Sequence, residues 1–304
     1  MIPDYQSIML PLLRHVSDKG EHKFRDIIDG LANKFGLTDG ERKELLPSGI
    51  QPIFQNRVGW AKTYLKKAGL IDTPKRATVT ITNRGLDILK KNLDSINVKF
   101  LKQFPEFVEF QTAKRVDGET EIEATEEQST QTPEETLETA YQKIRKSLAQ
   151  DLINRVMTLS PAFFESLVVE LLVKMGYGGS MKDAGKAIGK SGDEGIDGTI
   201  KEDKLGLDII YIQAKRWQPG NVVGRPELQK FVGALAGQGA KKGIFITTSS
   251  FTRDAMEYIP RNETKIVLID GEQLAQLMID YNLGVTSVSS YELKRIDSDY
   301  FGEE

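Results

Sequence analysis

The sequence predicts an α/β protein of two domains separated by an acidic linker. The first part contains three helical patterns followed by alternating apolar and polar residues, whereas the last part alternates helical and strand patterns. Between them, residues 117–135 read DGETEIEATEEQSTQTPEE, with almost no bulky apolar side chain. Such a segment buries too little surface to offset the entropy lost on ordering it. We therefore assign residues 1–111 and 136–304 to the domains and 112–135 to a flexible linker.

Length and composition limit the class of protein. A chain of 304 residues exceeds the usual size of one domain. It has no apolar run of about 18 residues and no basic-then-apolar start, so we expect no membrane partner and a cytoplasmic location. With no cysteine and two histidines, a metal would have to be bound by oxygen ligands, which favours Mg²⁺.

The first domain is predicted to be a winged helix. LIDTPKRATVTITNRG alternates in the manner of a short hairpin, and the helical pattern GLDILKKNL follows it. Three helices and a hairpin form a winged helix, a relative of the helix-turn-helix. The helical patterns lie at 4–17, 23–36 and 55–69.

The third helix is the candidate DNA-binding element. One narrow stripe on it is apolar and predicts contact with the core, through Val58, Ala61, Leu65 and Ala68. Although the formal net charge is −3, residues 56–91 contain nine basic and two acidic side chains. Amides, hydroxyls and ammonium groups suit base edges and phosphates, although a plain solvated face is the alternative. The candidate contacts are Gln55, Asn56, Arg57, Thr63, Lys66 and Lys67 on the helix and Lys75 and Arg76 in the hairpin.

The second domain is predicted to have a mixed central sheet flanked by helices. Ser160 is a good N-cap, and Pro161 follows it at the start of the helical pattern PAFFESLVVELLVKMG. Strand and helix patterns then alternate: IIYIQAKRW, PELQKFVGALAGQ, KGIFITTSS, RDAMEYI, KIVLID and GEQLAQLMIDY. This alternation is typical of a sheet covered by helices on its faces.

The strand at 209–217 carries an unusual pair of polar residues. Ile210, Ile212 and Ala214 point to one face, so Gln213 and Lys215 share the other. A charge in the middle of a sheet costs several kcal/mol without a partner, unless this is an edge strand with a solvated face. The candidate partner is Asp197, at a tight strand entry in GDEGIDG. An aspartate, a polar ligand and a lysine together suit phosphodiester hydrolysis assisted by a divalent cation.

The segments that contain these residues resemble a known protein family. GDEGIDGTI, IIYIQAKRW and VGRPELQKFVGALAGQGAKKGIFITTSSFT resemble the catalytic domain of Mrr restriction endonucleases, in the PD-(D/E)XK superfamily. NRVGWAKTYLKKAGL and ITNRG resemble the winged helix of that family. The resemblance implies a restriction-endonuclease-like second domain. It also implies that Mg²⁺, with Mn²⁺ as a possible substitute, supports cleavage of double-stranded DNA carrying methylated bases.

The resemblance also assigns roles by position. Asp197 matches the metal-binding aspartate and Lys215 the catalytic lysine, while Gln213 stands where the wider superfamily has Asp or Glu. An amide oxygen can bind Mg²⁺ but brings no charge, which weakens the site. Glu165 matches a helix carboxylate that completes such sites, with the polar face of an amphipathic helix as the alternative. Arg216 and Arg225 are either phosphate contacts or surface charges.

Three further expectations concern function. Because Gln213 weakens the metal site, a DNA-binding regulator with an inactive nuclease-like domain is the alternative to an enzyme. Cutting both strands requires two active sites, which predicts a homo-oligomer, a dimer or a tetramer. AGKAIGKS at 184–191 fits a loose phosphate-loop pattern, but no strand precedes it and no helix can begin after it, so we expect no nucleotide.

A last hypothesis concerns the acidic stretch. Residues 117–138 hold nine carboxylates and no basic side chain. They could occupy a basic DNA groove until substrate displaces them, a restraint that salt would screen.

Overall fold

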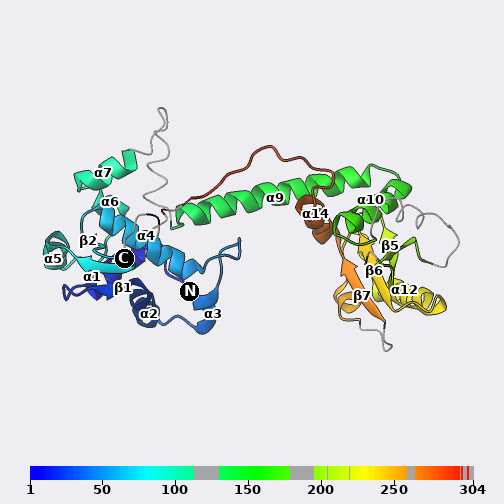
Figure 1. The fold of residues 1–304 in the computed structure, drawn as a ribbon, viewed down its shortest axis with the longest axis horizontal. Helices are drawn as coiled ribbons and strands as arrows, with labels where there is room; N and C mark the ends of the chain where they lie inside the picture. Colours follow the sequence, from blue (N-terminus) through cyan, green and yellow to red (C-terminus); the bar gives the residue numbers. More distant parts are fainter. Residues whose placement is uncertain are drawn as a thin grey trace. The chain divides into compact units, whose positions relative to one another are not determined.

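The computed structural model describes two compact units, shown in Figure 1, and each is described by itself. The described residues are 1–112, 130–178, 195–203, 205–218, 220–258, 264–294, 296 and 300. One unit comprises Met1–Lys143 with the C-terminal residues from Glu292, and the other Ile144–Tyr291. The boundary between the two units falls inside helix α9 (Pro133–Met157). Most of the expected linker and the whole of 184–191 lie outside the described residues.

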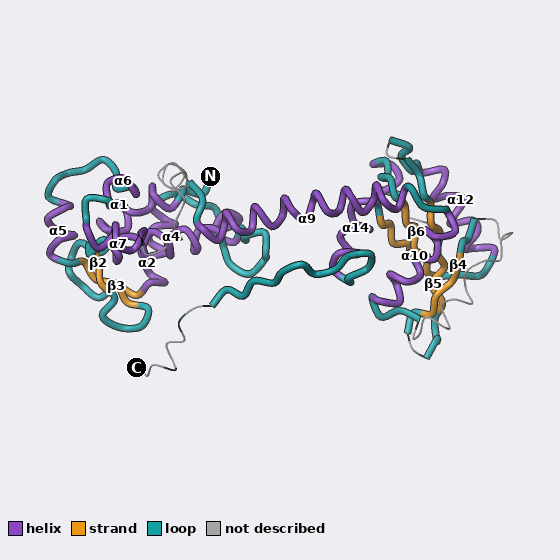
Figure 2. The backbone as a smooth tube through the Cα atoms, turned by 90° about the horizontal axis from the view of Figure 1, so that it is seen from above, coloured by secondary structure: helices purple, strands orange, loops and turns teal. Residues whose placement is uncertain are grey.

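The first unit contains the predicted helices and hairpin in the predicted order. Strands β1, β2 and β3 form an antiparallel sheet in the order β1-β3-β2, and Figure 2 shows β2 beside β3. The two-residue β1 and the short α3 were not predicted. The elements are α1 (Tyr5–His15), β1 (His22–Lys23), α2 (Phe24–Lys34), α3 (Asp39–Lys43), α4 (Ile53–Lys67), β2 (Ile71–Asp72), β3 (Thr78–Ile81), α5 (Asn83–Leu89), α6 (Val98–Leu101) and α7 (Pro105–Thr112).

Helix α4 lies at the centre of this unit because its apolar stripe is buried. Val58, Ala61 and Leu65 are fully buried in the same core as residues of α1, as the spacing predicted. Gly69 then ends the helix at φ +67°, a left-handed conformation that favours glycine. Its N–H and that of Leu70 bond back to carbonyls of the last helical turn, and the chain enters β2.

The second unit confirms the predicted mixed sheet. Its strand order is β4-β5-β6-β7, with β4 antiparallel to β5 and the last three strands parallel. Besides the end of α9, its elements are α10 (Pro161–Lys174), β4 (Gly198–Lys201), β5 (Ile209–Lys215), α12 (Arg225–Gly237), β6 (Lys242–Thr247), α13 (Arg253–Met256), β7 (Lys265–Ile269) and α14 (Gly271–Asp280).

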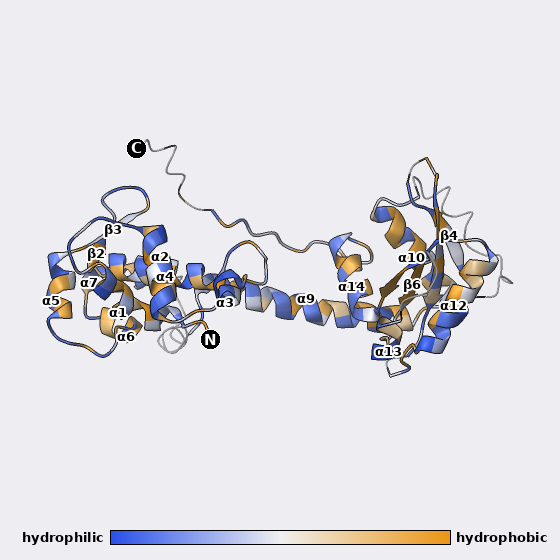
Figure 3. Cartoon of the chain, turned by 90° about the horizontal axis from the view of Figure 1, so that it is seen from below, coloured by the Kyte–Doolittle hydropathy of each residue, from blue (hydrophilic) through white to orange (hydrophobic). Residues whose placement is uncertain are grey.

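Helices cover both faces of this sheet. One core joins the sheet to α9, α10 and α14, and a smaller core joins it to α12 and α13. Figure 3 shows α10 and β6 mostly in orange, in keeping with this burial. Strand β5 is an inner strand, so the alternative of a solvated edge strand is excluded. No helix in the described ranges is long and apolar enough to cross a membrane.

Candidate active site

Asp197 is fixed at the entry to β4 by the main chain around it. Gly195, at φ +108°, turns the chain, and the N–H of Asp197 donates to the carbonyl of Ile212 at 2.8 Å. The Oδ2 atom of Asp197 accepts hydrogen bonds from Nε2 of Gln213 at 2.6 Å and from the N–H of Ala214 at 2.7 Å. The predicted meeting of Asp197 with the polar face of the next strand is therefore present in the structure.

The polar face of β5 brings Gln213 and Lys215 together. Gln213 is buried, with 3% of its surface exposed, whereas Lys215 is partly exposed at the strand end. Two threonines hold this end: Oγ1 of Thr247 and the N–H of Thr248 both donate to the carbonyl of Lys215. Thr247 is the last residue of β6, which runs parallel to β5, and Thr248 follows it, so both reach the end of β5.

Glu165 approaches the same group of side chains from α10. Ser160 caps this helix by accepting from the N–H of Phe163, which sets Glu165 in its second turn. Burial raises the pKa of Glu165, the negative charge of Asp197 raises it further, and Lys215 opposes both effects. Asp197 and Lys215 thus lie close enough to Glu165 to affect its charge. A glutamate that was only part of a solvated helix face would not have these neighbours.

The side chains at this site suit a hard divalent cation. Asp197 and Glu165 offer carboxylate oxygens, and Gln213 offers an amide oxygen, the ligand types that Mg²⁺ prefers. In the part of the chain that the structure describes, no three His, Cys, Asp or Glu residues cluster as a metal site. The amide presents its NH₂ group to Oδ2 of Asp197.

The two arginines predicted to contact phosphate are differently placed. Nη1 of Arg216 donates to the carbonyl of Met157 at 2.7 Å, and its Nε is buried without a partner among the described residues. Arg216 thus joins β5 to the end of α9, and we revise its predicted phosphate contact. Arg225 remains about half exposed, 3.4 Å from Asp254 and stacked over the ring of Tyr258.

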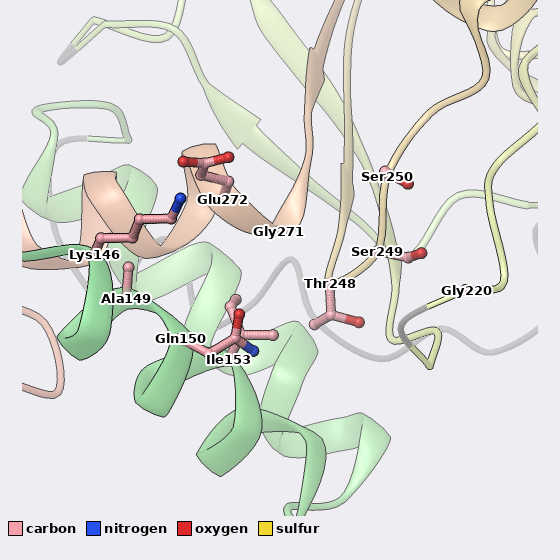
Figure 4. Close-up of a pocket in the computed structure, with 10 residues that line it drawn as sticks. All are labelled: Lys146, Ala149, Gln150, Ile153, Gly220, Thr248, Ser249, Ser250, Gly271 and Glu272. Carbon is pink, nitrogen blue, oxygen red and sulfur yellow. The ribbon is translucent and has the colours of Figure 1, made fainter. Parts of the chain in front are cut away.

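A cavity of about 270 Å³ lies where the carboxyl ends of β6 and β7 meet α9. Figure 4 shows Lys146 and Gln150 of α9 on one side and Thr248, Ser249 and Ser250 on the other. Oγ1 of Thr248 donates to the carbonyl of Trp217, whereas Oγ of Ser249 has no partner within the described chain. The cavity has no predicted catalytic residue in its lining.

Two of the predicted DNA contacts on α4 are used inside the first unit. Asn56 is only 4% exposed, donates to Gln51 and accepts from Oγ1 of Thr132 at 2.6 Å. Arg57 donates to both carboxylate oxygens of Glu135, and also to the carbonyls of Ile2 and Pro3. Burial and internal bonding make both residues unavailable to DNA, and we revise their predicted role accordingly.

The other predicted contacts keep polar atoms at the surface. Gln55, Lys66 and Lys67 of α4 are exposed, and so are Lys75 and Arg76 in the hairpin. Several also make local contacts. Thr63 Oγ1 donates a hydrogen bond to the Gly59 carbonyl, and Lys66 Nζ donates one to Thr73. The ammonium of Lys67 lies over the ring of Phe110, and Lys75 forms an ion pair with Glu21.

Sequence reasoning missed the docking of the start of α9 on α4. Thr132 and Glu135 exchange hydrogen bonds as a capping box, and Glu135 is 7% exposed beside Arg57. Nε1 of Trp60 donates to Glu134, and the N–H of Ser48 donates to Glu138. The sequence TPEE was a usable signal for a capped helix start. The described part of the acidic stretch is therefore folded against α4.

The family model "Mrr N-terminal domain" matches residues 5–91 and "Restriction endonuclease" matches 156–278. With the mostly helical first unit and the mixed sheet of the second, these matches define the class of protein as a restriction endonuclease. The "Type IV methyl-directed restriction enzyme EcoKMrr" of Escherichia coli (strain K12) is 38% identical over 314 residues, which cover 99% of each chain. The chain belongs to the Mrr family of restriction endonucleases.

Two solved structures are more distant. The modification-dependent restriction endonuclease AspBHI is 17% identical, with a TM-score of 0.36, over 46% of this chain and 36% of its own. The MspJI restriction endonuclease, in complex with a 27-mer oligonucleotide, is 18% identical, with a TM-score of 0.35, over 68% and 49%. Membership of a restriction-endonuclease family implies dependence on a divalent metal ion.

Proposed function

We propose that this protein cleaves methylated double-stranded DNA in the cytoplasm, with Mg²⁺ as its cation and Mn²⁺ as a substitute. The observation that carries the proposal is the meeting of Asp197, Gln213 and Lys215 at one end of β5. The relative named a methyl-directed restriction enzyme supports the choice of modified DNA as substrate.

In this proposal each residue at the site has a separate task. The Lys215 ammonium orients the attacking water and stabilises the negative charge that grows on the phosphate. Asp197 and Glu165 supply the carboxylates that hold the cation, and Gln213 adds a neutral oxygen. When bound, the cation supplies Lewis acidity and makes its water more acidic. The N–H of Ala214 keeps Asp197 in place for this task.

The winged helix supplies DNA binding in this proposal, through α4 and the hairpin after it. The competing function is a DNA-binding regulator whose nuclease-like domain is inactive. Gln213 favours that alternative, because an amide contributes no charge to cation binding. The two functions predict different consequences when the lysine at the site is removed.

Cleavage assays test the proposal directly. Purified protein is incubated with Mg²⁺ or Mn²⁺ and with plasmids from methylase-positive and methylase-negative hosts. We expect cleavage of methylated plasmid only, and loss of cleavage with retained binding in Lys215→Ala. If wild-type protein binds both plasmids and leaves both intact with either cation, the enzymatic proposal is wrong and the regulator is favoured.

A further inference from the structure

Helix α4 has two polar sides that differ in what they contact. One side, with Asn56, Arg57 and Trp60, is bonded to the start of α9. The other side holds Gln55, Gly59, Lys62 and Lys66, which we call the open face. Their spacing of four, three and four residues places them on one stripe of the helix.

The open face carries positive charge without a matching carboxylate. Nζ of Lys62 lies 4.2 Å from the centre of the Phe24 ring, and burial, followed by the charge of Lys66, lowers the pKa of Lys62. Within the described ranges, neither lysine is paired with an acidic side chain; the one bond of Lys66 goes to the hydroxyl of Thr73. Two unpaired cations on one stripe attract an anionic partner.

Gly59 has no structural reason to be glycine. It lies inside α4, where glycine is among the least favourable residues. A Cβ atom added there would meet nothing within 4 Å, whereas one added to Gly85 in α5 would lie 2.2 Å from the carbonyl oxygen of Leu70. Packing explains Gly85 but not Gly59. A bare helix backbone at the surface suits the close approach of another molecule.

We propose that the open face of α4 enters the major groove of double-stranded DNA, with Gly59 at the point of closest approach. Lys62 and Lys66 then contact phosphates, and Gln55 faces the base edges. The major groove admits an α-helix, and an amide can read bases by donating and accepting hydrogen bonds. This proposal rests on the proposed function, because it assumes that DNA is the substrate.

The bonded side of α4 fits this assignment. Its outer contacts are the carboxylates of Glu134 and Glu135, which would repel phosphate, and its arginine is already paired. The open face has neither feature. The same helix thus presents a structural side to its own chain and a cationic side to solvent.

Binding and stability measured together test the role of Gly59. Full-length protein in EDTA is titrated into a labelled duplex that wild-type protein cleaves when Mg²⁺ is added. Gly59→Ala should raise the Tm by about 4 °C, because alanine favours helix and nothing obstructs its methyl group. The same variant should bind DNA about tenfold more weakly, and Gly59→Gln more weakly still. Gly233→Ala, in a helix with the same open space, should leave DNA binding unchanged.

The lysines are tested through salt. Lys62→Gln with Lys66→Gln should reduce the slope of log K against log salt by about 1.8, since each phosphate contact contributes about 0.9. Lys99→Gln, an exposed lysine of α6, should not change the slope. Wild-type affinity in Gly59→Gln, or a wild-type slope in the double variant, overturns the open face as the DNA contact. Failure of wild-type protein to bind or cut any duplex instead overturns the proposed function.

Discussion

Gln213 limits the negative charge at the site when no cation is bound, and this affects the folding stability. Its amide donates to Asp197 at 2.6 Å, so Gln213→Glu would replace a hydrogen bond with two neighbouring negative charges. We expect this variant to lose about 1–3 kcal/mol of folding stability in EDTA. Added Mg²⁺ should restore the stability, because a cation between two carboxylates neutralises their repulsion. Thermal unfolding with EDTA and with Mg²⁺ measures both effects, and equal Tm values for variant and wild type in EDTA would contradict the prediction.

Lys215 is expected to act on the transition state rather than on DNA binding. Lys215→Ala should slow cleavage about 10²- to 10³-fold, the usual effect of removing one group that stabilises developing charge. Its Kd for DNA should stay close to that of wild type. Lys201→Ala, on the neighbouring strand β4, is the matched control and should keep full activity. Equal losses in binding and cleavage would show that Lys215 only holds DNA.

Glu165 should set the acid limit of activity. Its pKa lies above the ordinary value of 4.5, so Glu165 becomes protonated, and unable to hold a cation, at a higher pH than a free glutamate. We expect kcat/KM to fall as pH drops through this raised pKa, and the fall to move to lower pH at higher Mg²⁺ because a bound cation favours the ionised form. The raised pKa also destabilises the fold at neutral pH, where Glu165 is ionised. Glu165→Gln should raise the Mg²⁺ concentration needed for half-maximal cleavage, because a ligand is lost, and should slightly raise the Tm at pH 7, because the buried charge is lost. An acid limit independent of Mg²⁺ would argue against this role.

At the scale of elements, features that depend on residues close together in the sequence were predicted correctly. Features that depend on contacts between residues far apart in the sequence were not. Alternation along β5 is a local pattern, and it correctly placed Gln213 and Lys215 on the face that meets Asp197. The start of α9 was different. Its acidic composition predicted a linker, but burial of Glu135 depends on Arg57, 78 residues away in the sequence. Contacts with Thr132 and Glu135 take Asn56 and Arg57 from the surface, which no periodicity in α4 could reveal.

The Arg57–Glu135 pair should stabilise the docking of α9 on α4. Both side chains are mostly buried, so Glu135→Ala leaves the charge of Arg57 without a carboxylate partner, and we expect a loss of about 3 kcal/mol in the first unit. Replacing both residues with methionine should recover much of this loss. Urea unfolding measures the stability, and limited proteolysis near residue 130 reports undocking.

DNA binding by Glu135→Ala separates two roles for the acidic segment. If the segment only anchors α9, affinity at low salt stays at the wild-type value, because the open face lies on the other side of α4. If the acids restrain DNA binding, affinity at low salt rises and the gain disappears as salt screens the charges. The first result is the one that the contacts of Glu134 and Glu135 favour.

At the scale of the whole molecule, the distribution of charge matters more than its sum. A net charge of −3 argues weakly against DNA, yet the basic residues gather in and after α4 while acids gather in 117–138. The described acids from Glu134 onward are bonded within the first unit, which leaves the lysines of the open face without acidic partners in the described chain. The composition of each segment predicted DNA as the partner. Only the fold shows that one polar side of α4 is bonded to the start of α9 while the other side is not.

One active site per chain has a consequence for how this protein cuts DNA. In the proposed function, Asp197, Gln213 and Lys215 form one catalytic site in the described part of the chain, and one such site hydrolyses one strand at a time. The two strands of DNA are antiparallel, so cutting both at one place requires a second site in the opposite orientation. We therefore expect a dimer or tetramer of this chain in the cutting state.

Mixed oligomers test this expectation. Wild-type protein is preincubated with a tenfold excess of Lys215→Ala, which removes the ammonium but keeps the rest of the fold, and supercoiled methylated plasmid is then added with Mg²⁺. Subunit exchange produces oligomers with one active site, so nicked circles should accumulate and linear product should fall below the level of wild-type protein alone. The control adds the variant after the plasmid has been cut, when it should change nothing. Undiminished linear product without nicked circles, from protein that stays monomeric on DNA by analytical ultracentrifugation, would mean that one chain cuts both strands in succession.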